Sequence, residues 1–531
     1  MDPRTIHRRR WYILGVLTMS LLVVVLDNTI LNVALKTIAD DEKGLGATQS
    51  QLEWSINSYT LVFAGLLFTF GVIGDRIGRR RVLVGGMAVF ALASLASAYA
   101  QTPDQLIYAR ALMGLGGAAV MPQTLSIITN VFEPHERGRA IGIWAGAVGL
   151  GVAIGPLTGG LLLAHFWWGS VFLINVPVIA VGVVLLLLLV PESRNPNPGR
   201  LDPLGVVLSV VGLVVLSYGI IQGGEKGAWL EPAVLAPIAG GAAVLALFVL
   251  HEARTPSPAF DVRLFRDPRM SAAVASIALC FFAAVGVFFF TNFYMQSVRG
   301  LTPLQSGAMV LPFAAAQLLF SPRSAAMVRR FGAKAVCTSG LLLVTVALSS
   351  YQLVGVGTPL WILCAIFFVQ GAGMANVMPP ATESIMSALP REKAGAGSAI
   401  NNTARQVAVA MGVAVLGSVV ASVYRDDLRD DLAALPPGAR EAAGQSIEGA
   451  HGVASGMRGG QTLIDHADVA FVHAMHTASI AAAVIAFLGA MLVLKWMPGR
   501  GAAAPAGDAA EDGTAPDGTA PGASEQETAK V

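Results

Sequence analysis

Residues 114–122 read Gly-Leu-Gly-Gly-Ala-Ala-Val-Met-Pro, and residues 371–379 read Gly-Ala-Gly-Met-Ala-Asn-Val-Met-Pro. The two segments lie 257 residues apart, and the same offset pairs Gly138 with Gly395. A weaker echo links residues 71–80 with residues 325–334. A chain that repeats itself at this distance predicts two halves with one shared architecture.

The composition indicates that the chain is surrounded by lipid. Of 531 residues, 54% are hydrophobic and 13% are charged, and the mean hydropathy is +0.64. Soluble domains carry about 25% charged residues, so this chain has too few charges to cover a solvated surface. The net charge is only +2, and we expect no nucleic-acid partner. The three cysteines each lie within an apolar run, so we predict core packing for them and no metal site.

Fourteen apolar segments are long enough to cross a membrane, which takes about 20 residues as a helix. The predicted spans are residues 12–35, 52–74, 82–100, 104–130, 138–163, 170–190, 203–222, 232–251, 271–296, 303–326, 334–354, 358–388, 395–423 and 470–496. The echoes link the first six spans with the last six. We therefore predict an all-α integral membrane protein of two six-helix bundles with two inserted linker helices.

The predicted units follow from this repeat. Residues 1–195 form the first bundle, residues 196–265 the linker pair, and residues 266–498 the second bundle. The long loop 424–469 is expected either to form a helix–turn–helix cap or to stay a solvated, mobile loop. Residues 499–531 are rich in Ala, Gly and Pro, a composition that cannot bury a core and predicts a disordered tail.

The placement of basic residues predicts the orientation. They gather in alternate loops, where they are Arg76, Arg79, Arg80, Arg81, Arg137, Arg139, Arg254, Arg263, Arg266, Arg269, Arg329, Arg330 and Lys334. The opposite short loops are nearly free of Lys and Arg, so both termini are expected in the cytoplasm. The strong use of Ala, Gly, Val and Arg indicates a bacterial genome of high GC content. We expect a multi-pass protein of the bacterial inner membrane.

Four motifs in order resemble the major facilitator superfamily, specifically its fourteen-helix drug:proton antiporter family. They are Leu26-Asp-Asn-Thr-Ile-Leu-Asn-Val-Ala-Leu35, the loop Gly71 to Arg81, Arg110-Ala-Leu-Met-Gly-Leu-Gly-Gly117, and Gly151-Val-Ala-Ile-Gly-Pro-Leu-Thr-Gly-Gly160. Residues 167–177 and 401–406 also resemble the branch that exports quaternary ammonium compounds and dyes. The resemblance covers roughly residues 10–500. It implies a proton-driven exporter without a cofactor, working as a monomer on small-molecule drugs.

Asp27 is the first candidate for proton coupling. It follows an almost unbroken apolar run, where a charge costs about 2.5–3.5 kcal/mol on the insertion scale. Arg110 lies at a similar depth, about 10–12 Å from the outer surface at 1.5 Å per residue, so the two could pair. Burial favours the protonated acid and a nearby cation favours the carboxylate, so drug and proton would compete for Asp27. The alternative is a purely structural ion pair.

Glu383 and Arg405 form the second candidate pair. Glu383 lies near the cytoplasmic end of its span. Arg405 lies in the next span, counted from the same side of the membrane, and could neutralise Glu383. Either Glu383 takes part in proton or cation binding, or the two form a static pair.

The resemblance also implies two conformational elements. The loop residues Gly71, Asp75, Arg76, Gly78 and Arg79 are expected to latch the inner side when it is closed. In the fifth span, Gly151, Gly155, Pro156 and Gly159 carry the antiporter signature. Glycines 142, 146, 151, 155 and 159 are mostly four residues apart, which predicts one close-packing helical face.

Polar side chains within membrane helices usually face the bundle. On that ground we expect the substrate cavity to include Asn28, Asn57, Tyr59, Tyr294, Gln317 and Asn401.

Other classes of protein fit less well. No G-x-x-x-x-G-K-[ST] loop occurs, which disfavours an ATP-driven pump. The histidines are scattered, with only His466, His473 and His476 near one another, so neither a metal site nor an enzyme is expected. The predicted function is a proton-coupled antiporter that exports lipophilic, mostly cationic drugs. The alternative is a dedicated exporter of one metabolite, self-made antibiotic or lipid on the same scaffold.

Overall fold

The computed structural model describes residues 3–39, 44–47, 49–195, 202–226, 229–255, 262–390, 393–457 and 459–497. These residues form helices and no strand. Fourteen helical segments are long and apolar enough to cross a membrane, which confirms the predicted all-α membrane fold. The expected disordered tail, residues 499–531, lies outside the described residues.

The first bundle contains six spans. Its elements are α1 (Pro3–Ala39), α2 (Gln49–Ile77), α3 (Arg79–Ala98), α4 (Pro103–Val131), α5 (Pro134–His165), α6 (Ser170–Leu173) and α7 (Asn175–Leu189). The short α6 and α7 together make the sixth span. Helices α2 and α3 pack on α4, and α1 packs on α5 and α7.

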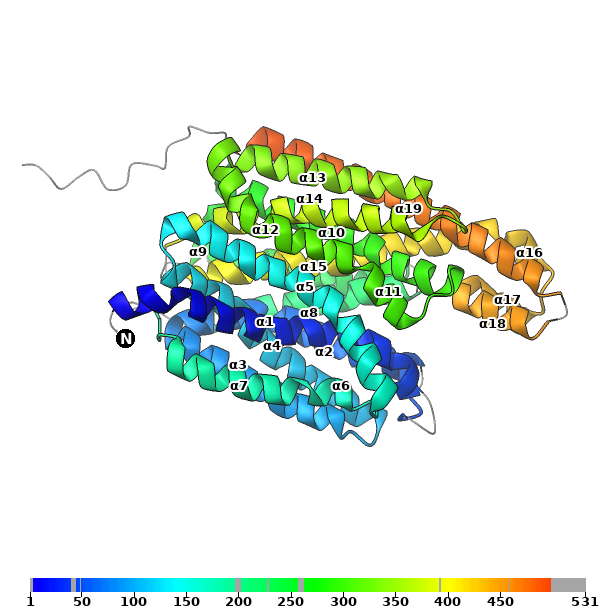
Figure 1. The fold of residues 1–531 in the computed structure, drawn as a ribbon, viewed down its shortest axis with the longest axis horizontal. Helices are drawn as coiled ribbons and strands as arrows, with labels where there is room; N and C mark the ends of the chain where they lie inside the picture. The colour runs from blue at the N-terminus through cyan, green and yellow to red at the C-terminus, as the bar shows by residue number, and fades with distance from the viewer. Residues whose placement is uncertain are drawn as a thin grey trace, which may run out of the picture.

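The second bundle also contains six spans. Its elements are η1 (Val262–Arg266), α10 (Pro268–Phe293), η2 (Tyr294–Val298), α11 (Pro303–Met309), α12 (Leu311–Phe331), α13 (Ala333–Ser349), η3 (Ser350–Leu353), α14 (Leu360–Ser387), α15 (Ala394–Asp427) and α19 (Gln461–Trp496). Figure 1 shows this bundle in the upper part of the view and most of the first bundle in the lower part.

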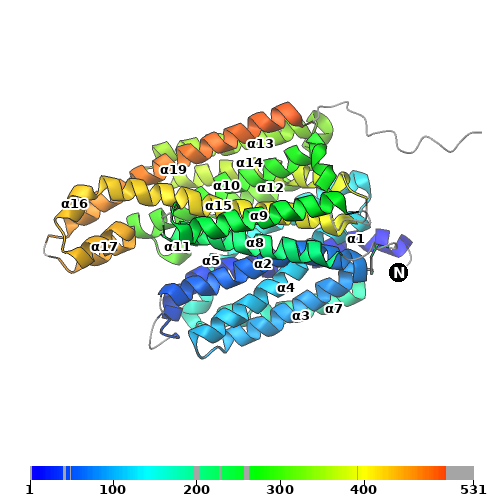
Figure 2. The ribbon, with the colours of Figure 1, turned by 180° about the vertical axis from the view of Figure 1, so that it is seen from behind.

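The two linker helices, α8 (Pro203–Lys226) and α9 (Pro232–Arg254), pack on each other. Helix α8 contacts α2 of the first bundle and α15 of the second. Figure 2 shows the pair in front of the seam between the bundles. The linker pair therefore covers one side of the junction.

Both described ends of the chain lie at the same end of the molecule, which we call the terminal end (Figure 1). At the other end, the hairpin end, three short helices project beyond the bundles: α16 (Arg429–Ala433), α17 (Pro437–Gln445) and α18 (Ile447–Ser455). Loop 424–469 therefore contains short helices, and we call α16 to α18 the helical cap. That these helices cover the exit stays a prediction.

The repeated glycines explain why the sequence echo exists. A Cβ added to Gly114 would lie 2.5 Å from the main-chain oxygen of Tyr59, and one added to Gly371 would lie 2.6 Å from that of Phe313. Real Cβ atoms do not approach an oxygen so closely, because C···O contacts start at about 3.3 Å. Glycine therefore lets α4 and α14 pack directly on the backbones of α2 and α12, in the same way in each half.

Candidate functional site

The buried ion pair of Asp27 and Arg110 joins α1 to α4. Both side chains are 1% exposed, and Nη1 of Arg110 donates a hydrogen bond to Oδ2 of Asp27. The other carboxylate oxygen, Oδ1, accepts a bond of 3.1 Å from Nδ2 of Asn175 in α7. Asn175 also donates to Oγ of Ser94 in α3 at 3.0 Å. One carboxylate thus ties four helices of the first bundle together.

An aromatic ring covers the arginine of this pair. The guanidinium carbon of Arg110 lies 4.5 Å from the centre of the Tyr59 ring. Asn28, next to Asp27 in α1, donates to the Tyr59 hydroxyl at 3.0 Å. Nε of Arg110 donates to the main-chain oxygen of Ser55 at 3.3 Å. Charge, cation–π contact and hydrogen bonds therefore all act on the same guanidinium.

Asn175 and Ser94 were not among the predicted site residues. Asparagine and serine occur often in membrane helices, so neither stands out as a charge does. The available signal was the position of Asn175 at the start of the strongly apolar helix α7. A polar side chain there needs a partner inside the bundle.

Asp75 connects the two bundles at the terminal end. Its carboxylate pairs with Arg79 at 2.7 Å and accepts bonds from the main-chain N–H groups of Gly395 at 2.9 Å and Ala396 at 3.2 Å. These N–H groups open α15, where a helix terminus carries partial positive charge. We call Asp75, Arg79, Gly395 and Ala396 the latch.

The backbone packing around the latch is equally tight. A Cβ on Gly395 would lie 2.2 Å from the main-chain oxygen of Gly71. Gly78 has a φ of 124°, which lets the chain turn from α2 into α3, and Gly332 has a φ of 84° between α12 and α13. Arg76, which we expected in the same gating motif, is half-buried.

The equivalent place in the second bundle has different chemistry. Arg329 stands three residues before Gly332, as Asp75 stands three residues before Gly78. Arg329 and Glu383 help to line a cavity of about 200 Å³ that also contains residues of α5 and α13. Glu383 interacts electrostatically with Arg137, and its Oε2 atom is buried without a hydrogen-bond partner.

Glu383 and Arg405, expected to be able to neutralise each other, are not joined by an ion pair among the described residues. Arg405 instead lies over the Phe281 ring, with its guanidinium carbon 5.6 Å from the ring centre. Nη2 of Arg405 lies 3.0 Å from Sδ of Met121 in the first bundle. A similar depth in the membrane did not bring these two side chains together. Glu383 and Arg405 point in different directions from their helices and contact different neighbours.

The predicted cavity residues divide among several environments. Asn28 and Tyr59 belong to the Asp27 network, and Asn57 is half-buried on α2. The Tyr294 hydroxyl donates to the main-chain oxygen of Gly355 at 2.8 Å, so it holds the loop after η3.

The glycines of α5 occupy two faces, not the single face that was predicted. Added Cβ atoms would meet α12 at positions 142, 146 and 149, but α1 at positions 151, 155 and 159. At 3.6 residues per turn, the step from 142 to 151 rotates the helix by about 180°, so the spacing of four does not continue through it. Gly149 packs on the stem of Gln317, whose Oε1 accepts from Ser321. Pro156 packs near Gly307 of α11.

Asn401 lies one helical turn before Arg405 in α15. Its Oδ1 accepts a hydrogen bond of 3.0 Å from Oγ1 of Thr382 in α14. Its Nδ2 is buried and has no hydrogen-bond partner. Asn401 thus presents an unused donor inside the protein.

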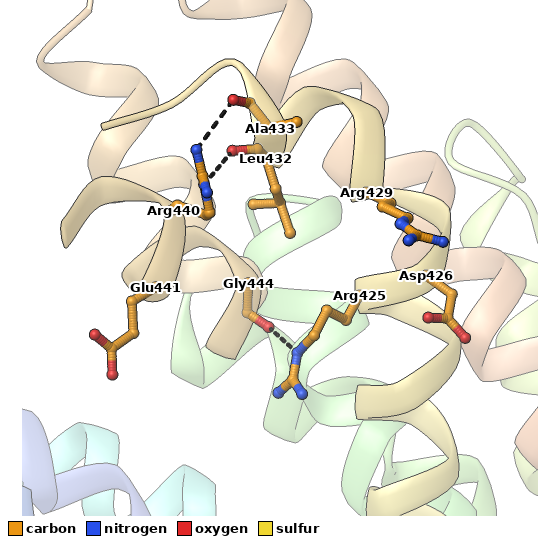
Figure 3. A pocket seen from close by; sticks show the side chains of 8 residues that line it. All are labelled: Arg425, Asp426, Arg429, Leu432, Ala433, Arg440, Glu441 and Gly444. Atoms are coloured by element: carbon orange, nitrogen blue, oxygen red, sulfur yellow. Dashed lines mark hydrogen bonds between the residues drawn. The ribbon is translucent and has the colours of Figure 1, made fainter. Parts of the chain in front are cut away.

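An open pocket of about 590 Å³ lies at the hairpin end, lined by the end of α15 and by residues of α16 and α17. Figure 3 shows Arg440 directed toward the main-chain oxygens of Leu432 and Ala433, and Arg425 toward that of Gly444. Two exposed histidines of α19 pair with this region: His466 with Asp431 at 2.9 Å and His473 with Asp427 at 2.6 Å. These contacts fasten the cap to α19.

Known proteins resemble this chain over nearly its whole length. The family model of the Major Facilitator Superfamily matches residues 17–413 of this chain. The multidrug efflux pump LfrA of Mycolicibacterium smegmatis is 35% identical over 91% of this chain and 96% of its own. The methyl viologen resistance protein SmvA of Salmonella typhimurium is 32% identical over 92% of this chain and 97% of its own. The tetracenomycin C resistance and export protein of Streptomyces glaucescens is 33% identical over 92% of this chain and 91% of its own.

Solved structures share the fold at low identity. The human organic anion transporter MFSD10 superposes with a TM-score of 0.60 at 16% identity, covering 92% of this chain and 99% of that chain. A bacterial homologue of the lysosomal transporter Spinster superposes with a TM-score of 0.55 at 17% identity, covering 92% and 98%.

Proposed function

Because this chain belongs to the Major Facilitator Superfamily, we propose that it exports lipophilic, mostly cationic drugs from the cytoplasm in exchange for protons. Its relatives named above are efflux, resistance and export proteins, which supports drug export. The chain spans a membrane many times, and the positive-inside rule supports a bacterial inner-membrane location with both termini in the cytoplasm.

The observation that carries this proposal is the buried carboxylate of Asp27. In the deprotonated state it is held by Arg110 and Asn175. Protonation removes the charge that Arg110 pairs with, so the pair must separate or lose most of its attraction. A cationic drug near Asp27 has the opposite effect, because it favours the carboxylate. Drug and proton therefore exclude each other at one group, which is the requirement for exchange.

The latch supports the alternation of access. Asp75 and Arg79 belong to the first bundle, and Gly395 and Ala396 belong to the second. Their contact holds the bundles together at the terminal end, which we take as the cytoplasmic side. Opening this contact would admit drug from the cytoplasm, and rocking of the bundles would expose the site to the outside.

Glu383 is proposed as a second proton-binding group on the cytoplasmic side. It faces a cavity at the terminal end, and one of its oxygens lacks a partner. A Glu383→Gln variant that keeps its fold but loses part of its substrate range would support this role. Unchanged selectivity with reduced stability would favour a structural one.

The proposed energy source is the proton gradient, with no cofactor, and the proposed working unit is a monomer. The second candidate function is export of one dedicated compound. The 33% identity to a tetracenomycin C resistance and export protein favours it.

Ethidium efflux from intact cells tests the proposal. We expect the wild type to export ethidium, and we expect export to stop with a protonophore or with Asp27→Asn. Asp27→Glu, which keeps the charge, should retain part of the activity. Asp104→Asn removes an exposed carboxylate and serves as the matched control, with activity near that of the wild type.

Two outcomes would contradict the proposal. Proton-coupled export by Asp27→Asn at the wild-type rate would remove Asp27 from the mechanism. A well-expressed wild type that exports no ethidium would favour the dedicated exporter.

A further inference from the structure

Arg405 is a buried cation that forms no ion pair with any carboxylate among the described residues. Its side chain is 4% exposed, and Nη1 is buried without a hydrogen-bond partner. Its neighbours are the sulfur of Met121 and the ring of Phe281. Such contacts are weak compared with a carboxylate, and arginines inside a membrane protein normally pair or face a water-filled path.

Arg405 lies well inside α15 and contacts the other bundle. Arg405 comes eleven residues after the first residue of α15, which corresponds to about 16 Å along the helix axis. The hydrocarbon core is about 30 Å thick, so this depth is near its middle. Arg405 belongs to the second bundle and touches Met121 of the first. Transporters of this architecture bind substrate near the midplane between their halves.

A second unused donor lies next to it. Asn401 precedes Arg405 by four residues, so both side chains share one face of α15. Thr382 occupies Oδ1 of Asn401, and Nδ2 remains buried without a partner. Two donors of this kind, one of them charged, match the two acceptor oxygens of a carboxylate.

The two acidic residues predicted for proton coupling, Asp27 and Glu383, do not pair with Arg405 in the described structure. Asp27 is engaged by Arg110 and Asn175. Glu383 lies near the end of α14, interacts with Arg137 and has no ion pair with Arg405 within the described parts of the chain. Within the described residues, neither carboxylate therefore occupies Arg405, and its guanidinium is available to an acidic group of a substrate.

We propose that Arg405 and Asn401 bind the carboxylate, or an equivalent acidic group, of the transported drug. This inference rests on the proposed export function and extends its substrates to zwitterions. In such a substrate the acidic group meets Arg405 and Asn401, while the cationic group competes with protons through Asp27. Purely cationic substrates would not use Arg405 as a ligand.

A matched pair of dyes separates these roles. Rhodamine B carries a free carboxylate and a delocalised cation, and its ethyl ester carries the cation alone. Binding of both dyes to purified full-length protein in lipid nanodiscs is measured by fluorescence anisotropy, for the wild type, Arg405→Met, Arg405→Lys and Asn401→Ala. Arg139→Met removes a guanidinium that lies 5.1 Å from the Trp11 ring and is the control for loss of a ring-stacked arginine.

We expect Arg405→Met to weaken rhodamine B binding by about 10- to 100-fold, as loss of a charge-assisted contact predicts, and to change ester binding by less than about twofold. Arg405→Lys should restore part of the affinity, Asn401→Ala should give a smaller selective loss, and Arg139→Met should change neither dye. Varying the chloride concentration should not alter the result.

Four outcomes would overturn the inference. An equal loss for both dyes in Arg405→Met would make Arg405 structural. Wild type that binds the ester but not rhodamine B would exclude an acidic subsite, and competition by chloride alone would assign the site to a free anion. If the wild type bound neither dye, the proposed drug export would fail and this inference with it.

Discussion

Gly114→Ala tests whether close packing of α4 on α2 positions the Asp27–Arg110 pair. The added Cβ would lie 2.5 Å from the main-chain oxygen of Tyr59. Reaching an ordinary C···O distance of about 3.3–3.6 Å requires a movement of roughly 0.8–1.1 Å. Tyr59 carries the ring that covers Arg110 and the hydroxyl that binds Asn28, so this movement acts directly on the network.

The magnitude follows from the contact that is lost. A cation–π contact contributes about 0.5–2 kcal/mol, which corresponds to about 2- to 30-fold in a rate. We expect ethidium efflux by Gly114→Ala to fall within that range. Overpacking should also destabilise the fold by about 1–3 kcal/mol, which appears as a lower melting temperature of the purified protein.

Gly371→Ala is the matched control, because its Cβ would lie 2.6 Å from the main-chain oxygen of Phe313 in the equivalent place of the second bundle. It should lower the melting temperature similarly while leaving the pH dependence of efflux unchanged. Gly85→Ala, with no atom near its added Cβ, should match the wild type. Wild-type efflux and melting in Gly114→Ala would refute the reasoning.

Three further predictions concern the surrounding network. Asn175→Ala removes a donor to the carboxylate of Asp27, which favours the protonated acid, so half-maximal ethidium binding by purified protein should move to higher pH. Asp75→Asn removes the carboxylate that pairs with Arg79 and accepts from the first N–H groups of α15. The latch should open more often, so a cysteine in the first turn of α15 should react faster with an impermeant maleimide in everted vesicles. Gly155→Ala puts a Cβ 1.8 Å from a threonine hydroxyl of α1, and export should be lost although expression in the membrane persists.

The fold was predictable because lipid imposes strong rules on a sequence. Fourteen apolar segments predict fourteen helices, since only helices or closed barrels satisfy the backbone in a membrane. The echo of residues 114–122 in residues 371–379 predicts two similar bundles. It reflects glycines that contact the backbone of the neighbouring helix in both halves.

The charged part of the site was predictable for the same reason. Asp27 and Arg110 stand out in apolar spans, and their similar depth meant that they could pair. Asn175 was missed because an amide costs less to bury than a charge and so stands out less, although its position at the start of the apolar α7 indicated a partner inside the bundle. Whether Glu383 contacts Arg405 was left open, because the depth of a residue in the membrane does not say in which direction its side chain points from the helix.

The two faces of α5 show a different failure. The spacing of its glycines was interpreted as one face, but nine residues separate positions 142 and 151, which reverses the direction of the side chain. Adding up the rotation of 100° per residue about the axis of α5 would have predicted two glycine faces, one toward α12 and one toward α1. This arrangement lets a single helix pack tightly on both bundles.

Proton release on drug binding tests the central claim most directly. Ethidium is added to purified protein in weakly buffered detergent solution that contains a pH-sensitive dye, at a pH where Asp27 is protonated in the drug-free protein. We expect proton release that saturates with ethidium binding in the wild type, and ethidium binding without release in Asp27→Asn. Equal release from both proteins would contradict competition between drug and proton at Asp27.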